Sequence, residues 1–507
     1  MHPHEKTPGH TTRGITCAAG LLLVLVGTAR CGKAAATHAT AAAPILRVGI
    51  GGAPAQTAER GVQQFISNIS NEGLLRVNRE GRLEPWLVES WRTSTDGLLV
   101  TLRLTPHVTF HDGSPLDAVA AAKSLRDTLP KALGAVFEDI DSIAATSDAE
   151  ITVRFRRPSP FVLESLIDIT VQKPGSVATS TGPFMAKPAP QDSTSPPDIE
   201  AYGQYHLGHP RIGRIVVNTY PNVRAAWADM LRDRLDMLYE VGVDALASME
   251  GASSVSLYTF DRPYQYAVLL NARSPKLRSP KTRRALNQAV DRSAIVRLAM
   301  AGHGTPSAGP VSQHHWAFRN PGSTFDYLPV EAAATLATTH SGRMSLRCLT
   351  PAGPPYERLA LVLKQQLQDV GVDMSIDEYT PDNLGRALSN PDFEALVVDI
   401  ASGWSLFRPY RWMHSKGPGN LIGFSSGSVD AALDRIRHAA NDAEYRAGTA
   451  AFQQAAADDP PAIFLAWSDR SRAVTRRFDV QAEAGRDVLS TLRLWKPTDM
   501  APQTSQR

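Results

Sequence analysis

The stretch LEPWLVESWRTSTDGLLVTLRLTPHVTFHDGSPL spans residues 83–116 and decides the fold prediction. Residues 98–104 follow a Ser-Thr-Asp-Gly turn and carry the apolar pattern of a strand. Phe110-His111-Asp112-Gly113 predicts a strand that ends in a turn, because Asp accepts hydrogen bonds from the backbone and Gly adopts positive φ. We therefore interpret His111 and Asp112 as structural residues and not as an acid–base pair.

Strand and helix patterns alternate through the second half of the chain. Residues 264–270 and 462–466 predict strands, and residues 279–300 predict a single helix. This alternation predicts an α/β fold with a mainly parallel sheet. Residues 173–202 are rich in Pro, Ser, Thr and Gly, and we expect them to form a loop.

Several short motifs occur in an order and spacing that is similar to a known family. Besides residues 83–116, they are Asn71-Glu72-Gly73-Leu74, Ser180-Thr181-Gly182-Pro183-Phe184, residues 279–292 and Gly403-Trp404. Over residues 45–495 the chain resembles the family 5 extracellular solute-binding proteins, the receptors of peptide and nickel ABC importers. The resemblance implies a periplasmic binding protein type II-like α/β fold, with two lobes, an extra subdomain on the first lobe and a ligand cleft between the lobes.

The same resemblance implies where the domains begin and end. Lobe I is expected to comprise residues 45–68, 182–263 and 478–507. The extra subdomain is expected at residues 69–181 and lobe II at residues 264–477. Ahead of them lie an export signal at residues 1–31 and a flexible tether at residues 32–44.

The N-terminus has the pattern of an export signal. Lys6 and Arg13 precede an apolar run at residues 14–29, which is shorter than the roughly 20 apolar residues that span a bilayer. Cys31 and a glycine follow, which resembles a lipoprotein processing site, although Arg30 stands where lipoproteins usually carry a small residue. We expect lipidation at Cys31, and the alternative is cleavage near residues 34–36 with free release.

The charge balance and the cysteine count argue against some classes of function. Lys plus Arg number 53 and Asp plus Glu 50, a balance that argues against nucleic acid as a partner. Cys17 lies in the signal and Cys31 at its end, so Cys348 is the one cysteine of the mature body, in an apolar run that predicts a buried, inert thiol. We expect no cofactor and no metal; the tandem His314-His315 is interpreted as an ordinary pair of polar residues.

The candidate binding residues centre on residues 402–412. In peptide-binding relatives the matching loop carries an acid that pairs with the peptide's amino terminus, whereas no Asp or Glu lies between Trp404 and Trp412 here. We predict that Trp404 forms a cleft wall and that Arg408 or Arg411 supplies a positive charge, which favours an anionic or uncharged solute, or a peptide held in another way. Further candidates are Ser67, Ser70, Tyr264 and Tyr266.

The sequence therefore predicts a solute-binding receptor of an ABC-type importer. We expect an exported, monomeric protein at the periplasmic or cell-surface side of the cytoplasmic membrane, with a peptide or small molecule as ligand and permease subunits as partners. One alternative is a sensory or scaffold lipoprotein of the same fold that does not transport. The other is an extracellular hydrolase, although the chain has no Gly-x-Ser-x-Gly or His-Glu-x-x-His motif. The identity of the ligand stays open.

Overall fold

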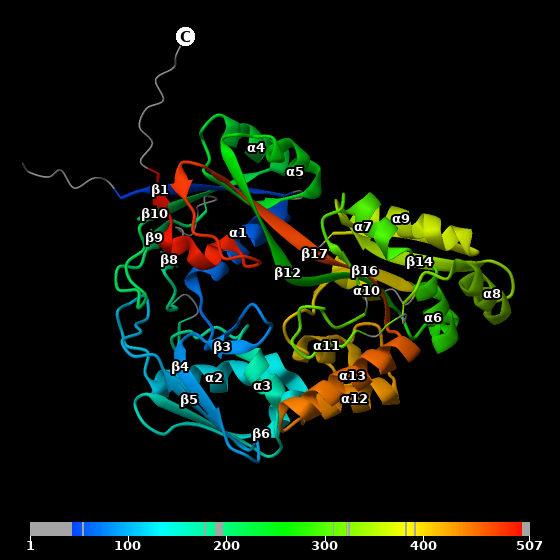
Figure 1. Cartoon of the computed structure of the whole chain (residues 1–507), viewed down its shortest axis with the longest axis horizontal. Helices are drawn as coiled ribbons and strands as arrows, with labels where there is room; N and C mark the ends of the chain where they lie inside the picture. The colour runs from blue at the N-terminus through cyan, green and yellow to red at the C-terminus, as the bar shows by residue number, and fades with distance from the viewer. Residues whose placement is uncertain are drawn as a thin grey trace, which may run out of the picture. The chain divides into compact units, whose positions relative to one another are not determined.

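Two long strands run through the middle of the structure: β12, Val255–Leu270, and β17, Ala462–Thr475 (Figure 1). They pair antiparallel, and their register shifts between Asp261 and Gln265 and again after Tyr266. The strands predicted at residues 264–270 and 462–466 are therefore only parts of longer ones. The remaining parts carry charged residues, which hide the apolar pattern of a strand.

The computed structural model describes residues 43–498 except 53–54, 177–178, 188–195, 308, 321, 323–324, 381–382 and 390–391. Residues from Ala43 onward form one compact unit. The predicted signal with Cys31, and the tether up to Ala42, lie outside the described residues. None of the helices described combines the length and the apolar character that crossing a bilayer requires.

The long strands belong to a large sheet with the strand order β15-β14-β16-β12-β17-β11-β1-β10-β9-β8, and β13 pairs with β17. The other strands of this sheet are β1 (Ile45–Gly51), β8 (Phe184–Ala186), β9 (Ile199–Ala201), β10 (Arg214–Tyr220), β11 (Met237–Val241), β13 (Thr305–Pro306), β14 (Met344–Pro351), β15 (Val372–Tyr379) and β16 (Ala395–Ala401). β1 pairs parallel with β10 and β11, and β14 pairs parallel with β15 and β16. β12 and β17 pair antiparallel with all their neighbours. The sheet is mixed, so the prediction of a mainly parallel sheet is wrong.

A separate antiparallel sheet has the order β4-β5-β7-β6. Its strands are β4 (Val88–Thr93), β5 (Leu99–Leu104), β6 (Ile140–Ala145) and β7 (Glu150–Phe155), and two small pairs elsewhere are β2 (Leu75–Val77) with β3 (Leu83–Pro85) and β18 (Phe478–Asp479) with β19 (Lys496–Pro497). Gly113 has a φ of 81°, and Asp112 Oδ1 accepts from the Ser114 backbone N–H at 3.0 Å, which confirms the predicted turn. His111 Nε2 lies 2.9 Å from the Gly182 carbonyl, a structural contact.

Some of the helices pack on these sheets and the others pack on neighbouring helices (Figure 1). They are α1 (Ala55–Ser70), α2 (Ala118–Leu133), α3 (Pro160–Ser165), α4 (Val223–Leu231), α5 (Val243–Glu250), α6 (Pro280–Gln288), α7 (Arg292–Ala299), α8 (Pro329–Thr339), α9 (Tyr356–Asp369), α10 (Leu384–Ser389), α11 (Phe407–Met413), α12 (Gly427–Arg437) and α13 (Asp442–Asp458), with 3-10 turns at Gly134–Asp139, Pro275–Leu277 and Val488–Leu494. The predicted helix at residues 279–300 is in fact α6 and α7. Asp291 separates them, because its side chain caps α7 by accepting from the Ala294 backbone N–H at 2.9 Å.

Three apolar cores match the expected parts of the fold. One core joins β1, α1, β10 and the C-terminal 3-10 turn, as expected for lobe I. A second joins β14, β15, α6, α7 and α9, as expected for lobe II. The third fills the extra subdomain and also includes residues of α11, α12 and α13. The fold is therefore α/β with two lobes and an extra subdomain, and the residue boundaries between them stay a prediction.

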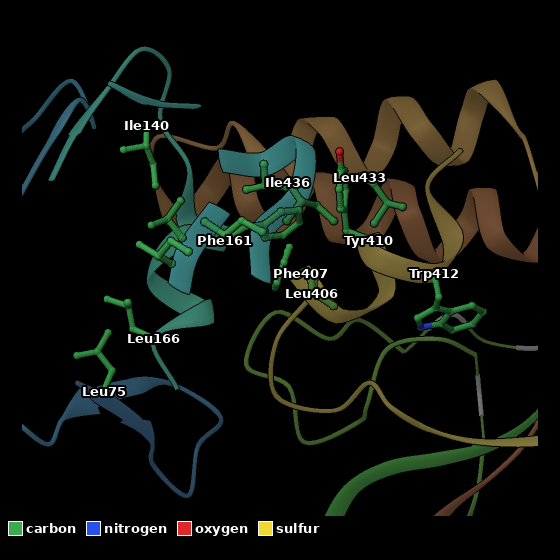
Figure 2. Packing of buried hydrophobic residues seen from close by; sticks show 14 of the residues in the cluster. Leu75, Ile140, Phe161, Leu166, Leu406, Phe407, Tyr410, Trp412, Leu433 and Ile436 are labelled. Carbon is green, nitrogen blue, oxygen red and sulfur yellow. The ribbon is translucent and has the colours of Figure 1, made fainter. Parts of the chain in front are cut away.

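The third core shows how the extra subdomain joins the helices of the C-terminal half. Figure 2 shows Phe161 of α3 beside Phe407 and Tyr410 of α11. The ring centre of Phe161 lies 5.9 Å from that of Phe407 and 5.5 Å from that of Tyr410. Ile436 of α12 belongs to the same cluster. We call this contact between residues 69–181 and α11–α13 the subdomain joint.

Two buried carboxylates add polar bonds to the subdomain joint. Asp139 accepts from Arg437 Nε at 2.6 Å and Nη2 at 2.9 Å. Glu164 accepts from Ser405 Oγ at 2.7 Å, the Phe407 backbone N–H at 3.1 Å and the Tyr445 hydroxyl. Burial raises the pKa of Glu164, although these donors favour its charged form. The subdomain joint is thus closed to water and held by groups from distant parts of the chain.

The segment predicted as a loop at residues 173–202 contains two short strands, β8 and β9. They pair with each other and extend the large sheet beyond β10. Gly182 lies just before β8, where the chain enters the large sheet. Its N–H donates to the Ser70 carbonyl at 2.9 Å. A Cβ at position 182 would lie 2.5 Å from the same oxygen, so only glycine fits there.

Candidate functional site

A cavity of about 830 Å³ lies where α1, β11, β12, β17, the residues around β2 and residues 484–490 meet. Trp404 and His314 contribute to it from lobe II, and Trp86 and Ile167 from the extra subdomain. All three expected parts of the fold therefore face the same space. A volume of this size fits a small solute or a short peptide.

One face of α1 forms a polar wall of the cavity. Arg60, Gln64 and Asn68 follow one another at four-residue spacing and all line the cavity. Asn68 Nδ2 donates to the Tyr239 hydroxyl at 3.1 Å, which ties this wall to β11. The opposite face of α1 carries Val62, Phe65 and Ile69 in the lobe I core.

The crossing strands supply a compact charged cluster. Arg262 Nη1 of β12 and Arg470 Nη2 of β17 lie 3.1 and 3.2 Å from Asp399 Oδ2 of β16. Arg470 Nε lies 3.3 Å from Glu240 Oε1 of β11. Arg262, Arg470 and Glu240 line the cavity, whereas Asp399 lies behind them. We call these four residues the crossing-strand cluster.

The charges in the crossing-strand cluster shift one another's pKa values. Attraction to Arg470 lowers the pKa of Glu240, whose side chain is half exposed, and burial opposes this shift only in part. Burial raises the pKa of Asp399, against the attraction of Arg262 and Arg470. Burial disfavours the charge of Arg470, but Glu240 and its other neighbours outweigh this effect and raise its pKa. Glu240 is therefore ionised at neutral pH, beside two permanent cations.

A second arginine lies further along β17. Arg472 Nε donates to Asp487 Oδ1 at 2.5 Å, and Arg472 Nη1 donates to the Tyr239 carbonyl. The guanidinium carbon of Arg472 lies 4.2 Å from the centre of the Tyr239 ring and 5.1 Å from that of Phe260. These contacts hold Arg472 rigidly against two aromatic rings in the cavity wall.

Another arginine pair lies where the extra subdomain meets residues 484–490. Arg76 Nε and Arg486 Nη2 lie 2.6 and 2.9 Å from Glu84 Oε1. Arg76 also lies over the Trp86 ring, with its guanidinium carbon 4.1 Å from the ring centre. Trp86 Nε1 in turn donates to Glu72 Oε1 at 3.0 Å. The wall on this side is therefore aromatic and cationic, like the wall formed by the crossing strands.

The residues predicted from the 402–412 segment lie in different places. Trp404 is partly exposed and lines the cavity. Arg408 does not line it: Nε and Nη2 pair with Asp168 of the extra subdomain at 3.0 and 2.5 Å. Arg411 is exposed on α11, also away from the cavity. The contact of any of these residues with a ligand stays a prediction.

The other predicted site residues do not line the cavity. Ser67 is exposed and accepts from Asn71, and Ser70 is buried at the C-terminal end of α1. Tyr264 lies under Arg262, with the guanidinium carbon 3.6 Å from its ring centre. Tyr266 is buried in the lobe II core against Tyr356, and burial raises the pKa of Tyr266 to about 12. Tyr264 thus holds the guanidinium group of Arg262 in place by stacking against it.

The two adjacent histidines, His314 and His315, have different surroundings. His314 is half exposed at the cavity, 3.8 Å from Asp261. His315 is buried beside the rings of Trp316 and Tyr445, which stack on each other. The described residues contain no cluster of three or more His, Cys, Asp or Glu side chains that could hold a metal ion. Cys348 is buried and unpaired, as predicted, and burial raises the pKa of its thiol to about 12.

Sequence reasoning missed the crossing-strand cluster and the polar face of α1. The signal for α1 was present, because apolar residues at 62, 65 and 69 fix the buried face and leave Arg60, Gln64 and Asn68 on the other side. No comparable signal exists for Arg262 and Arg470. They lie about 200 positions apart in the sequence, and only the pairing of β12 with β17 brings them together.

Two lobes around a cavity next to crossing strands define a solute-binding protein of the periplasmic type. The model of the family "Bacterial extracellular solute-binding proteins, family 5 Middle" matches residues 82–420. The chain belongs to this family. It is therefore a solute-binding receptor of an ABC-type importer, and it acts outside the cytoplasmic membrane.

The relatives agree with this assignment. The chain is 22% identical to the glutathione-binding protein GsiB of Pectobacterium atrosepticum, an alignment that covers 85% of this chain and 84% of GsiB. Its fold is similar to the oligopeptide-binding protein AppA of Bacillus subtilis in complex with a nonapeptide, with a TM-score of 0.73, 20% identity, and 89% and 98% of the two chains covered. It is also similar to NikZ of Campylobacter jejuni in complex with Ni(L-His), with a TM-score of 0.75, 19% identity, and 89% and 99% covered.

Proposed function

We propose that this receptor captures a small solute that carries at least one anionic group. The observation that carries this proposal is the lining of the cavity, where seven arginines meet four carboxylates. Guanidinium groups offer planar pairs of donors that match a carboxylate. The aromatic walls at Trp86, Tyr239, Phe260 and Trp404 supply contact area for the rest of the solute.

The ligands of the relatives support this class of solute. GsiB is named for glutathione, and AppA and NikZ were solved with a nonapeptide and with Ni(L-His). Glutathione, a peptide and histidine all carry a carboxylate. The cavity of this protein has the charge to hold such a group, and it lacks the acid that the 404–412 segment would need to hold an amino terminus there.

The proposal can be tested without knowing the solute. The purified protein is unfolded, washed and refolded to remove anything it carried, and its melting temperature is measured with a panel of small acids and short peptides. Each compound is paired with its uncharged amide. We expect stabilisation by acids and not by their amides. Equal stabilisation by the amides would contradict an anionic solute.

We also propose that the receptor binds its solute without catalysis, as a monomer, and that closure of the two lobes around it prepares delivery to the permease. The cavity supports closure, because its walls come from both lobes and from the extra subdomain. Small-angle scattering with a stabilising acid should show a smaller radius of gyration. Tight binding with an unchanged radius would contradict closure, and release of a modified solute would contradict binding without catalysis.

We propose that the mature protein is tethered to the membrane by a lipid on Cys31. The support is the position of Cys31 directly after the apolar run of the signal. The substitution Cys31→Ala should move the protein from the membrane fraction to the soluble fraction. Equal membrane attachment of the variant would contradict the lipid anchor.

A further inference from the structure

Asp399 holds two arginines in place from behind the cavity wall. One oxygen of this carboxylate, Oδ2, binds both Arg262 and Arg470, and only 9% of the Asp399 side chain is exposed. Arg262 is also stacked on Tyr264. The two guanidinium groups therefore have fixed positions before any solute arrives, which reduces the entropy lost when they bind one.

Without Glu240, the charges of the crossing-strand cluster sum to one positive charge, which one anionic group can neutralise. Arg262 and Arg470 bring two positive charges, and Asp399 neutralises one of them from the far side. The remaining positive charge faces Glu240, whose side chain is half exposed in the cavity. Arg470 Nε is buried, and no acceptor among the described residues meets it in hydrogen-bonding geometry, including Glu240 Oε1 at 3.3 Å. A buried charged donor without an acceptor is unfavourable, so the site gains when an acceptor arrives.

We propose that Arg262 and Arg470 form the subsite for a carboxylate of the solute, and that Glu240 occupies this position until the solute carboxylate replaces it. This inference rests on the proposed capture of an anionic solute, and it names the residues that would bind the negative charge of that solute. Glu240 can leave because its side chain is half exposed and makes no hydrogen bond to the two arginines in the described structure. Asp399 cannot leave, because it is buried and bound by both arginines.

The charge balance selects a carboxylate over other groups. An ammonium group would meet two guanidinium groups at the cavity surface, and like charges repel. A phosphate dianion would bring two negative charges where only one is uncompensated. A carboxylate brings one charge and two coplanar oxygens, one of which can accept from Arg470 Nε.

The test uses succinate, which carries one singly charged carboxylate at each end and can place one of them at this subsite. The readout is the melting temperature of the purified protein, with sodium chloride at equal ionic strength as reference. Glu240→Gln removes the competing carboxylate while keeping the shape of the side chain. We expect it to lower the succinate concentration for half-maximal stabilisation by about tenfold, as expected when a competing anion is removed from a charged site. Adding Arg470→Lys, which keeps the positive charge that Asp399 needs, should remove that gain, because lysine lacks the planar fork.

Asp168→Asn is the matched control. It frees Arg408 from its carboxylate just as Glu240→Gln frees Arg470, but Arg408 does not line the cavity. We expect no gain in succinate affinity from Asp168→Asn. The inference is overturned if Glu240→Gln gives no gain, if Asp168→Asn gives an equal gain, or if the gain survives Arg470→Lys.

A cavity-filling variant separates this inference from the proposed function. Asn68→Trp places a large side chain in the cavity from the exposed face of α1. If succinate binding is lost in Asn68→Trp but is insensitive to Glu240→Gln and Arg470→Lys, the subsite is wrong and the anion-binding cavity stands. If Asn68→Trp binds succinate like the unsubstituted protein, both the subsite and the proposed cavity are wrong.

Discussion

Arg408 and Arg470 each pair with an aspartate, but the two pairs lie in different surroundings. Arg408 meets Asp168 at the edge of the subdomain joint, where the extra subdomain contacts α11. Arg470 meets Asp399 beneath the cavity, next to Arg262 and the movable carboxylate of Glu240. The first pair has one acid for one arginine and connects two parts of the fold. The second has a surplus of positive charge on the side of the cavity. The neighbours of an arginine, more than the arginine itself, therefore decide whether it can bind a solute.

The largest effect should come from the subdomain joint. Arg437→Met keeps most of the side-chain volume but removes the arginine that pairs with Asp139. The Asp139 side chain has no exposed surface. We expect the free energy of unfolding to fall by about 3 kcal/mol, the lower end of the usual cost of breaking a buried ion pair, because Arg157 and Ser159 still donate to Asp139 at 3.0 Å. Urea unfolding measures this loss. Adding Asp139→Leu should recover part of it, and a loss below about 1 kcal/mol would mean that the joint is not closed to water as described.

His314 and His315 also lie in different surroundings, since His315 is buried in the core and His314 lines the cavity. Burial lowers the pKa of His315 to about 3, and the charge of Arg82 adds to this effect. The unfolded chain therefore binds a proton at this residue near pH 6.5, whereas the folded chain stays neutral down to about pH 3. Stability from neutral His315 is complete above pH 6.5 and is lost as the pH falls, by about 1.4 kcal/mol per pH unit. The measurement is urea unfolding at pH 7, 6 and 5.

Two variants make the pH test specific. His315→Phe should reduce the loss of stability between pH 7 and pH 5 by about 2 kcal/mol, because no proton can bind there. His314→Phe, at the half-exposed neighbouring position, is the matched control for the loss of a histidine. Equal slopes for the unsubstituted protein and His315→Phe would contradict the burial of His315.

Within the 402–412 segment, Trp404 and Arg408 test which residues face the solute. Trp404→Ala should weaken binding of a stabilising acid by about 1–3 kcal/mol, the value of burying a large apolar side chain. Arg408→Ala should change that affinity little, because Arg408 is turned toward Asp168. Fluorescence or calorimetric titration measures both. A larger loss from Arg408→Ala than from Trp404→Ala would place the binding site beside Arg408 and away from the crossing strands.

The smallest effect should come from Asp168→Asn. Asp168 is about half exposed, and exposed ion pairs contribute about 0–1 kcal/mol. We therefore expect a loss of less than about 1 kcal/mol in urea unfolding. A loss as large as that of Arg437→Met would mean that the Arg408–Asp168 pair is as essential to the joint as the buried pair.

Local chemistry made part of the fold predictable from the sequence. The turn at Gly113 follows from the conformational freedom of glycine and the hydrogen bonding of Asp112, and both are seen in the structure. The break at Asp291 was missed because apolar residues on both sides continue the helical pattern, and only the capping hydrogen bond shows where the second helix begins. The short strands β8 and β9 were missed because three residues are too few to give a pattern.

The candidate site was less predictable, because it depends on contacts between distant segments. The absence of an acid near Trp404 suggested positive charge in the cleft, and the cavity is indeed rich in arginine. The arginines that line it come from α1, β12, β17, the residues around β2 and residues 484–490, and none comes from residues 402–412. The charge of a segment can be read from its sequence, but the direction of each side chain depends on partners such as Asp168 and Asp399.

Native mass spectrometry of the protein purified under gentle conditions tests the central claim most directly. The account predicts a bound small solute that carries a carboxylate, and it predicts that the Asn68→Trp variant, with its cavity filled, carries none. A protein that binds only uncharged or cationic solutes would contradict the anionic class. An Asn68→Trp variant that carries the same solute in the same amount would contradict the cavity itself.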